Sequence, residues 1–191
     1  MRRTSFFLLA VLLVSVGANA DDVDHPNGAV DRKDDATAIS QEKELAEFGD
    51  LTAQFNLAVS YEFGIGVAQD DEQAVYWYTK SAEQGFANAQ SNLAVMHYEG
   101  RGTPRDYEQA AYWFTKAAEQ GDPKSQNNLG AIYYQGRGVE RDYQQAHFWW
   151  TLAAAQGNEN AYRNLDMVEK LMTPEQIAEA QRLAYEWLRN R

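Results

Sequence analysis

Apolar positions in this chain recur with a period of 36 residues. Residues 89–121 match, position by position, the segments that begin one period earlier at Ala53 and one period later at Ser125. Ala53, Leu57 and Tyr61 are spaced by four residues, which places them on one face of a helix, and a second helical pattern follows in each unit. The pattern predicts an all-α fold, a right-handed α/α superhelical solenoid of about four helix-turn-helix repeats with capping helices.

Glycines and aspartates mark the ends of the predicted helices. Paired glycines such as Gly64 and Gly66 follow the first helix of each unit, where a left-handed conformation ends a helix without steric cost. Paired glycines also cradle phosphate, but at the opening of a helix, so we interpret these as helix ends. Asp70, Asp106 and Asp142 precede the second helices and are predicted N-caps.

These signals divide the whole chain. The predicted parts are a signal peptide at 1–20, a flexible acidic leader at 21–33, an N-terminal capping helix at 34–48, repeats at 49–84, 85–120 and 121–156, and a degenerate fourth repeat with a C-terminal capping helix at 157–191.

The first twenty residues have the features of a secretory signal peptide. Two arginines precede an apolar run from Phe6 to Val16, and small residues at Ala18 and Ala20 form a cleavage site. A retained membrane anchor is the alternative, but the run is short for a membrane span. We therefore expect cleavage after Ala20, a periplasmic or secreted protein, and no membrane span after signal removal.

Composition excludes several partners and chemistries. The net charge is −11, and removal of the predicted signal peptide, which carries two arginines and no acid, makes the chain more negative. Nucleic acids and anionic membranes require a basic surface, so neither is an expected partner, whereas a basic protein is. The chain contains no Cys, which excludes disulfides, thiolate metal sites and thiol catalysis. No cofactor is expected.

The order A-x-x-x-L-x-x-x-Y-x-x-G-x-G, then D-x-x-x-A-x-x-W and A-x-x-G, resembles the Sel-1-like repeat, a longer relative of the tetratricopeptide repeat. The resemblance covers residues 34–191, although the fourth unit lacks the glycine pair. It implies an α/α superhelix that serves as an adaptor for proteins or peptides. Some cysteine-rich relatives are reported to bind or cleave β-lactams, and the Cys residues that define them are absent here, so this activity is not carried over.

The first helix of each repeat is expected to line the inner, concave face of the solenoid. On a helical wheel, Phe55, Val59 and Glu62 point away from the core stripe. Aromatic side chains with polar neighbours suit a protein or peptide partner, and packing between neighbouring helices is the alternative use of these positions. The candidate partner-binding residues are Phe55, Val59, Glu62, Ser91, Val95, Tyr98, Asn127, Tyr134 and Arg163.

One asparagine recurs in each unit: Asn56, Asn92, Asn128 and Asn164. Each could hold a peptide backbone or fasten its own helix to the next unit, and recurrence in every unit favours the fastening role. His97 stands where other units have tyrosine, and His147 lies in a different unit, so we predict neither a metal site nor a catalytic histidine.

The function predicted from these patterns is an exported, monomeric interaction scaffold without catalysis of its own, acting as an inhibitor or immunity protein or as a host-interaction factor. The alternative is a cell-wall or β-lactam hydrolase, suggested only by relatives. Its nearest nucleophile and base would be Ser91 and His97. On a helix these residues lie about 240° apart around the axis, so they cannot meet.

Overall fold

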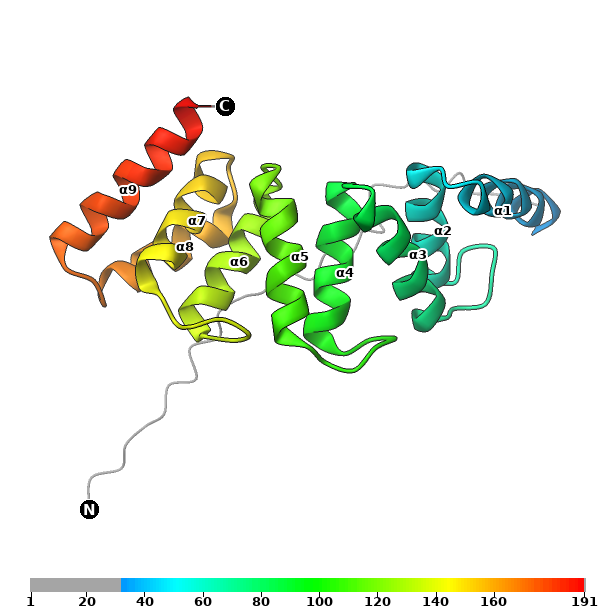
Figure 1. Cartoon of the computed structure of the whole chain (residues 1–191), viewed down its shortest axis with the longest axis horizontal. Coiled ribbons are helices and arrows are strands. Elements are labelled where there is room, and N and C mark those ends of the chain that lie inside the picture. The colour runs from blue at the N-terminus through cyan, green and yellow to red at the C-terminus, as the bar shows by residue number, and fades with distance from the viewer. Residues whose placement is uncertain (1–31, 191) are drawn as a thin grey trace, which may run out of the picture.

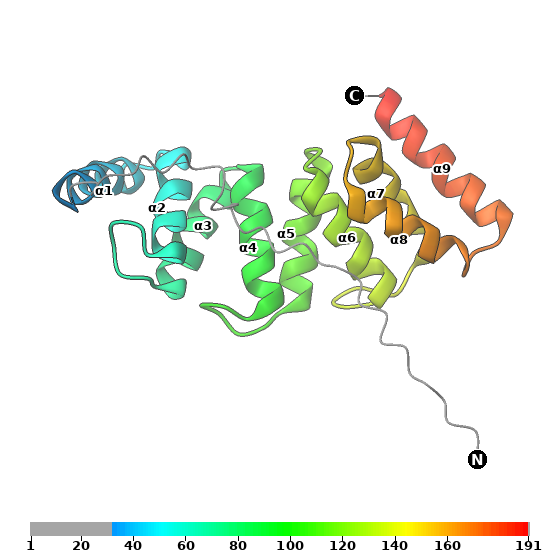
Figure 2. The same ribbon diagram turned by 180° about the vertical axis from the view of Figure 1, so that it is seen from behind.

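The protein is described by a computed structural model over residues 32–190, and these residues form α-helices stacked in one row (Figure 1). The row runs in chain order from α1 at one end to α9 at the other, and the view from behind shows the same order (Figure 2). Residues 32–190 contain no strand, which confirms the predicted all-α solenoid. The helices are α1 (Arg32–Glu47), α2 (Leu51–Phe63), α3 (Asp71–Glu83), α4 (Ala87–Glu99), α5 (Tyr107–Glu119), α6 (Pro123–Gln135), α7 (Tyr143–Ala155), α8 (Glu159–Glu169) and α9 (Pro174–Arg189).

The helices pack in pairs, α2 with α3, α4 with α5 and α6 with α7, and each pair packs on the next. The first helix of each pair ends at a left-handed glycine, with φ of 69°, 75° and 68° at Gly64, Gly100 and Gly136. The second helix of each pair begins at an aspartate that accepts hydrogen bonds from two backbone N–H groups: Asp70, Asp106 and Asp142. The predicted helix ends are confirmed at all six positions.

The N-terminal capping helix begins slightly earlier than the sequence pattern suggests. α1 starts at Arg32 rather than at 34, so the last two residues of the predicted leader, 21–33, lie in this helix. The predicted signal peptide, residues 1–20, and the rest of the leader lie outside the described residues.

A repeated chain of glutamine hydrogen bonds joins the units. The side-chain amides of Gln54, Gln90 and Gln126 each donate to a backbone carbonyl eight residues earlier, at 3.0–3.2 Å. A second set of glutamines, at the ends of α3, α5 and α7, donates to the side-chain oxygens of the first set at 2.7–2.8 Å: Gln84, Gln120 and Gln156. Because these amides donate to carbonyls at the ends of preceding helices, the glutamines link each unit to the helix before it.

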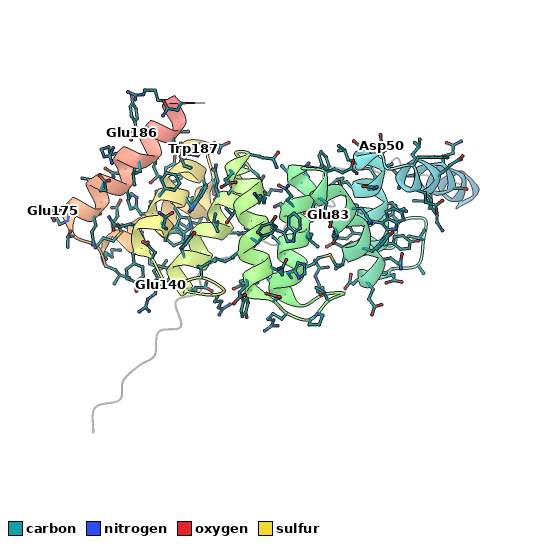
Figure 3. The ribbon with its side chains drawn as sticks, in the orientation of Figure 1. Asp50, Glu83, Glu140, Glu175, Glu186 and Trp187 are labelled. Carbon is teal, nitrogen blue, oxygen red and sulfur yellow. The ribbon has the colours of Figure 1, made fainter. Side chains whose placement is uncertain are left out.

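The last helix leaves the line of the repeats. α9 packs on α7 instead of pairing with α8, and it leans away from α8 in both views. Ala184 and Trp187 join the core cluster that contains Trp149 and Leu152, and Figure 3 shows Trp187 on the side of α9 that faces the row. A capping box formed by Thr173 and Gln176 starts this helix.

The stripe of α7 that corresponds to the outer face of α3 and α5 differs in sequence. In α3 and α5 the residues at 72, 76, 80 and at 108, 112, 116 read Glu-Tyr-Lys, whereas the residues of α7 at 144, 148 and 152 read Gln-Phe-Leu. Leu152 is fully buried, while Lys80 and Lys116 are exposed. The exchange of a cation for leucine thus fits α7 to be covered by α9.

Candidate functional site

A groove near the N-terminal end of the row is the candidate binding site. It lies between α1, α2, α4 and the start of α6, and its volume is about 500 Å³. This volume is within the range of sites that bind ligands or side chains of a partner. Its apolar members are Phe55, Val59 and Phe63, all from α2.

Two phenylalanines give the groove its aromatic surface. The ring of Phe55 lies 5.8 Å from that of Tyr78 and 5.1 Å, edge to face, from that of Phe86, so its orientation is fixed by packing. Phe63 is 45% exposed. The next two units have serine and asparagine at the position of Phe55, and glutamate and glutamine at the position of Phe63. The aromatic pair therefore belongs to the first unit alone and is not required by the repeat.

Polar groups surround these rings. Asn56 and Asn88 are exposed amides on α2 and α4. The hydroxyl of Ser91, at the opposite side of the groove, donates to Asp122 at 3.4 Å and accepts from Ser125 at 2.9 Å, which ties α4 to the start of α6. Glu42, Asp122 and Lys124 are the charged residues of the lining. The site thus offers an aromatic surface and amide groups, and its charged residues are two carboxylates and one lysine.

The expectation that the nine candidate residues form one exposed face is wrong. Phe55, Val59 and Ser91 do line the groove, but Ser91 is itself buried, as are Glu62, Val95 and Asn127. The helical wheel assumed one buried face, whereas α4 and α6 lie between the second helix of the preceding unit and their own, so that residues 89–96 and 125–132 are buried all round. Tyr98 and Tyr134 are partly exposed and Arg163 is exposed, and none of these three lies in the groove.

Glu62 belongs to a buried network between the first two units. Its carboxylate accepts a hydrogen bond from the Tyr78 hydroxyl at 2.7 Å and another from Arg101 at 2.7 Å. Asn92 in turn donates to the Tyr78 hydroxyl at 2.9 Å. Burial, and then the nearby Glu62 carboxylate, raise the pKa of Tyr78, so its hydroxyl stays protonated and donates. Burial alone would lower the pKa of Arg101, but hydrogen bonds to Glu62 and Glu99 outweigh burial and raise it. Nothing in the local sequence signals this contact, which joins positions 39 residues apart.

The recurring asparagines are used in two ways. Asn92, Asn128 and Asn164 are buried, and Asn164 donates to the side chain of Asn127 at 3.1 Å across two units. Asn56 is exposed and lines the groove. The fastening role favoured by the sequence therefore fits Asn92, which donates to Tyr78, and Asn164, although both bonds reach the preceding unit and not the next one. Asn128 accepts from its neighbour Asn127 in the same helix, and Asn56 is available to a ligand.

Within residues 32–190, Ser91 forms a hydrogen bond with neither His97 nor His147. Nε2 of His147 lies 3.0 Å from the Glu169 carboxylate, a pairing between α7 and α8 that the sequence could not indicate. His97 lies in another unit, where burial lowers its pKa against the opposing effect of Asp106. The hydrogen bonds of Ser91 go to Asp122 and Ser125, not to a histidine. In the same range no three His, Asp or Glu residues converge as a metal site.

Comparison with known proteins defines the family. The sequence matches the Sel1 repeat over residues 51–86, 87–122 and 123–158, units that begin two residues later than the divisions at 49, 85 and 121. A crystal structure of a Sel1 repeat protein from Oxalobacter formigenes is similar, with 39% identity over 68% of this chain and 97% of that chain and a TM-score of 0.62. The chain belongs to the Sel1 repeat family.

A second solved structure shares the fold. Helicobacter pylori cysteine rich protein B aligns with 70% of this chain and 96% of its own, with 22% identity and a TM-score of 0.54. The comparison with curated proteins gives no match. Sel1 repeat proteins are, in general, non-catalytic scaffolds for protein–protein interaction. No helix among the described residues is long and apolar enough to cross a membrane.

Proposed function

We propose that this protein is an exported scaffold that binds a protein or peptide segment in the groove between α1, α2 and α4. The observation that supports this function is the presence of Phe55 and Phe63 in the groove of the first unit, beside exposed amides. Aromatic side chains supply much of the binding free energy at interfaces, and an amide can pair with both polar groups of a peptide backbone. Because packing already fixes the Phe55 ring, little ordering is needed on binding.

The proposed partner is basic and lies outside the cytoplasm. The chain has a net charge of −11, which would accelerate encounter with a basic protein. Residues 1–20 support export to the periplasm or the medium. Two specific roles fit this function. One is an inhibitor or immunity protein that blocks an exported enzyme, and the other is a host-interaction factor.

Peptide selection tests the groove. The immobilised protein would be panned against a random peptide library, and the enriched peptides would be measured against Phe63→Ala and against Tyr112→Ala. Tyr112 is 50% exposed on α5 and lies outside the groove, so it is a matched control for the 45% exposed Phe63. We expect at least a tenfold loss of affinity, about 1.4 kcal/mol, for the groove variant only. Equal binding by wild type and Phe63→Ala would overturn the groove proposal.

Export is tested separately. Fractionation of the producing cell, followed by N-terminal sequencing of the recovered protein, should give a chain that begins at Asp21. A chain that keeps its first twenty residues and stays in the cytoplasm would contradict export without affecting the groove.

A further inference from the structure

Each described loop with a Gly-Arg-Gly sequence places its arginine on the preceding unit. Arg101, in the loop after α4, donates to Glu62 at 2.7 Å and lies 3.7 Å from Asp71. One period later, the guanidinium of Arg137 lies over the rings of Tyr98 and Tyr107, at 5.6 and 5.4 Å from their centroids. Tyr98 and Tyr107 occupy the positions of Glu62 and Asp71 in the repeat. The same place in the first and second units therefore receives a cation from the following loop, once on carboxylates and once on aromatic rings.

The second glycine of each loop shows how closely the loop packs on the preceding unit. Gly102 and Gly138 have φ of +64° and +71°, and a Cβ atom on them would lie 2.1 and 2.2 Å from the backbone oxygens of Asp71 and Tyr107. Only glycine fits so near another backbone. The loop of one unit thus packs directly on the start of the second helix of the unit before it.

The third unit has the receiving residues but not the loop. Tyr134 and Tyr143 stand one period after Tyr98 and Tyr107, with their ring centroids 5.6 Å apart. The residue one period after Arg137 is Thr173, which caps α9. Because α9 turns away to pack on α7, no arginine of a following unit reaches this pair within the described residues.

The surroundings of the tyrosine pair leave it able to hold a cation. Both rings are partly exposed, and Trp150 lies behind Tyr134 with its ring centroid 5.8 Å away. Met172, which replaces the first glycine of the loop, packs with the core cluster beside them. Among residues 32–190 the cation over the pair is Arg141 of the same unit, 5.6 Å from the Tyr143 ring. Its charge also acts on the Tyr134 hydroxyl, but no cation lies over the Tyr134 ring in these residues.

A second copy of this chain, stacked end to end, would not supply the missing cation. The first unit has the loop Gly64-Ile65-Gly66, so Ile65 occupies the position of the arginine. The acidic net charge of the chain favours a basic segment from a different protein.

We propose that Tyr134 and Tyr143 form a docking site for an arginine of a protein partner, held between glycines in a tight turn and seated as Arg137 is seated on Tyr98 and Tyr107. This proposal names a chemical feature of the partner and rests on the proposed scaffold function. The tyrosine pair lies in a different part of the row from the groove, and its test uses a different probe. The groove proposal and the arginine-docking proposal can therefore fail independently.

The test uses the protein's own loop as the probe. A blocked peptide with the sequence Gln-Gly-Arg-Gly-Val-Glu, which copies residues 135–140, is titrated into the full chain with isotope-labelled tyrosine rings, up to about 10 mM because isolated loops bind weakly. The ring signals of Tyr134 and Tyr143 are expected to shift. A matched peptide with isoleucine in place of arginine, as in the first unit, should leave them unmoved.

Variants assign the interaction to the aromatic faces. Arg137 also donates a hydrogen bond to the Tyr98 hydroxyl, so Tyr134→Phe, which keeps the ring but removes the corresponding acceptor, should weaken binding only partly. Tyr143→Leu removes a ring and should weaken binding about threefold to thirtyfold, the range of a cation on an aromatic ring. Tyr76→Leu, on the outer face of α3, is the control and should bind as wild type. Equal shifts with the isoleucine peptide, unchanged binding by Tyr143→Leu, or no tyrosine shift at the highest concentration would each overturn the proposal. The two peptides test the wild-type protein, so the result does not depend on the folding of a variant.

Discussion

Gly130 lies directly against Trp150, so closely that a methyl group on Gly130 would sit 2.6 Å from the indole nitrogen. The indole N–H donates to the carbonyl of Asn127 at 2.9 Å, which holds the ring in place. The two preceding repeats have alanine and a smaller ring, tyrosine or phenylalanine, at these two positions. The side-chain volume that Trp150 adds in the third repeat is therefore balanced by the loss of a methyl group at Gly130.

Gly130→Ala should destabilise the protein, although alanine has a higher helix propensity than glycine. We expect a loss of about 1–3 kcal/mol in the free energy of unfolding because the methyl group overpacks against a fixed ring. Adding Trp150→Phe recreates the alanine and phenylalanine of the second repeat and should recover part of this loss. Urea unfolding of the two single variants and the double variant measures the coupling. Strictly additive effects, or a stabilising Gly130→Ala, would show that the two residues do not compete for space.

The arginine between the first two units should matter for stability because its partner is buried. Arg101→Gln leaves the Glu62 carboxylate, 4% exposed, without its cation. The expected loss is about 2 kcal/mol, the usual size for a hydrogen bond to a charged group. Arg105→Gln, in the same loop but exposed, is the matched control. The double variant Glu62→Gln/Arg101→Gln removes the unpaired charge and should lose less than Arg101→Gln; an equal or greater loss would contradict the pairing.

His97 should make the protein sensitive to mild acid. Burial lowers its pKa below the ordinary value of 6.5, and its Nδ1 has no hydrogen-bond partner. Below pH 6.5 the unfolded chain therefore binds a proton that the folded chain does not, so stability falls as the pH falls through this range. His97→Tyr installs the residue that the neighbouring repeats have at this position and should remove this part of the pH dependence. Thermal unfolding of both proteins at about pH 7.5 and about pH 5 measures it. If wild type and His97→Tyr lose stability equally at low pH, groups other than His97 cause the acid sensitivity.

Leu152 should hold α9 on α7. Leu152→Lys restores the lysine of the two preceding repeats and would bury a cation beneath α9. We expect faster hydrogen exchange in α9 and a loss of about 2–3 kcal/mol or more in docking, since a buried leucine contributes that much. The reverse change Lys80→Leu, on the exposed stripe of α3, should leave exchange in α9 unaltered. Unchanged exchange in Leu152→Lys would mean that α9 is held by other contacts.

The parts of the fold that depend on residues close together in the sequence were predictable. The caps at Gly64 and Asp70 are local features, and the 36-residue period identifies every repeated one. The recurring glutamines such as Gln54 were equally visible, but their partners lie in the preceding helices, so periodicity alone did not reveal their role.

The features that depend on packing between units could not be read from one helix at a time. A helical wheel places Glu62 outward, but it is buried because Arg101 arrives from the next loop. The sequence did not identify Phe63 as a binding residue, because single exposed aromatic side chains are common on protein surfaces. Its position beside Phe55 in the groove is visible only in the structure.

The direction of the arginine contacts also governs how such an array can lengthen. A duplicate of residues 87–122 inserted after the original would bring its own Arg101 onto the existing Tyr98 and Tyr107, and would offer the same two rings to Arg137. A duplicate of the first unit would bring Ile65 instead, and one placed after the third would meet the turn to α9. Duplication of the middle unit would therefore preserve the arginine contacts between units, whereas duplication of the first or the third unit would not.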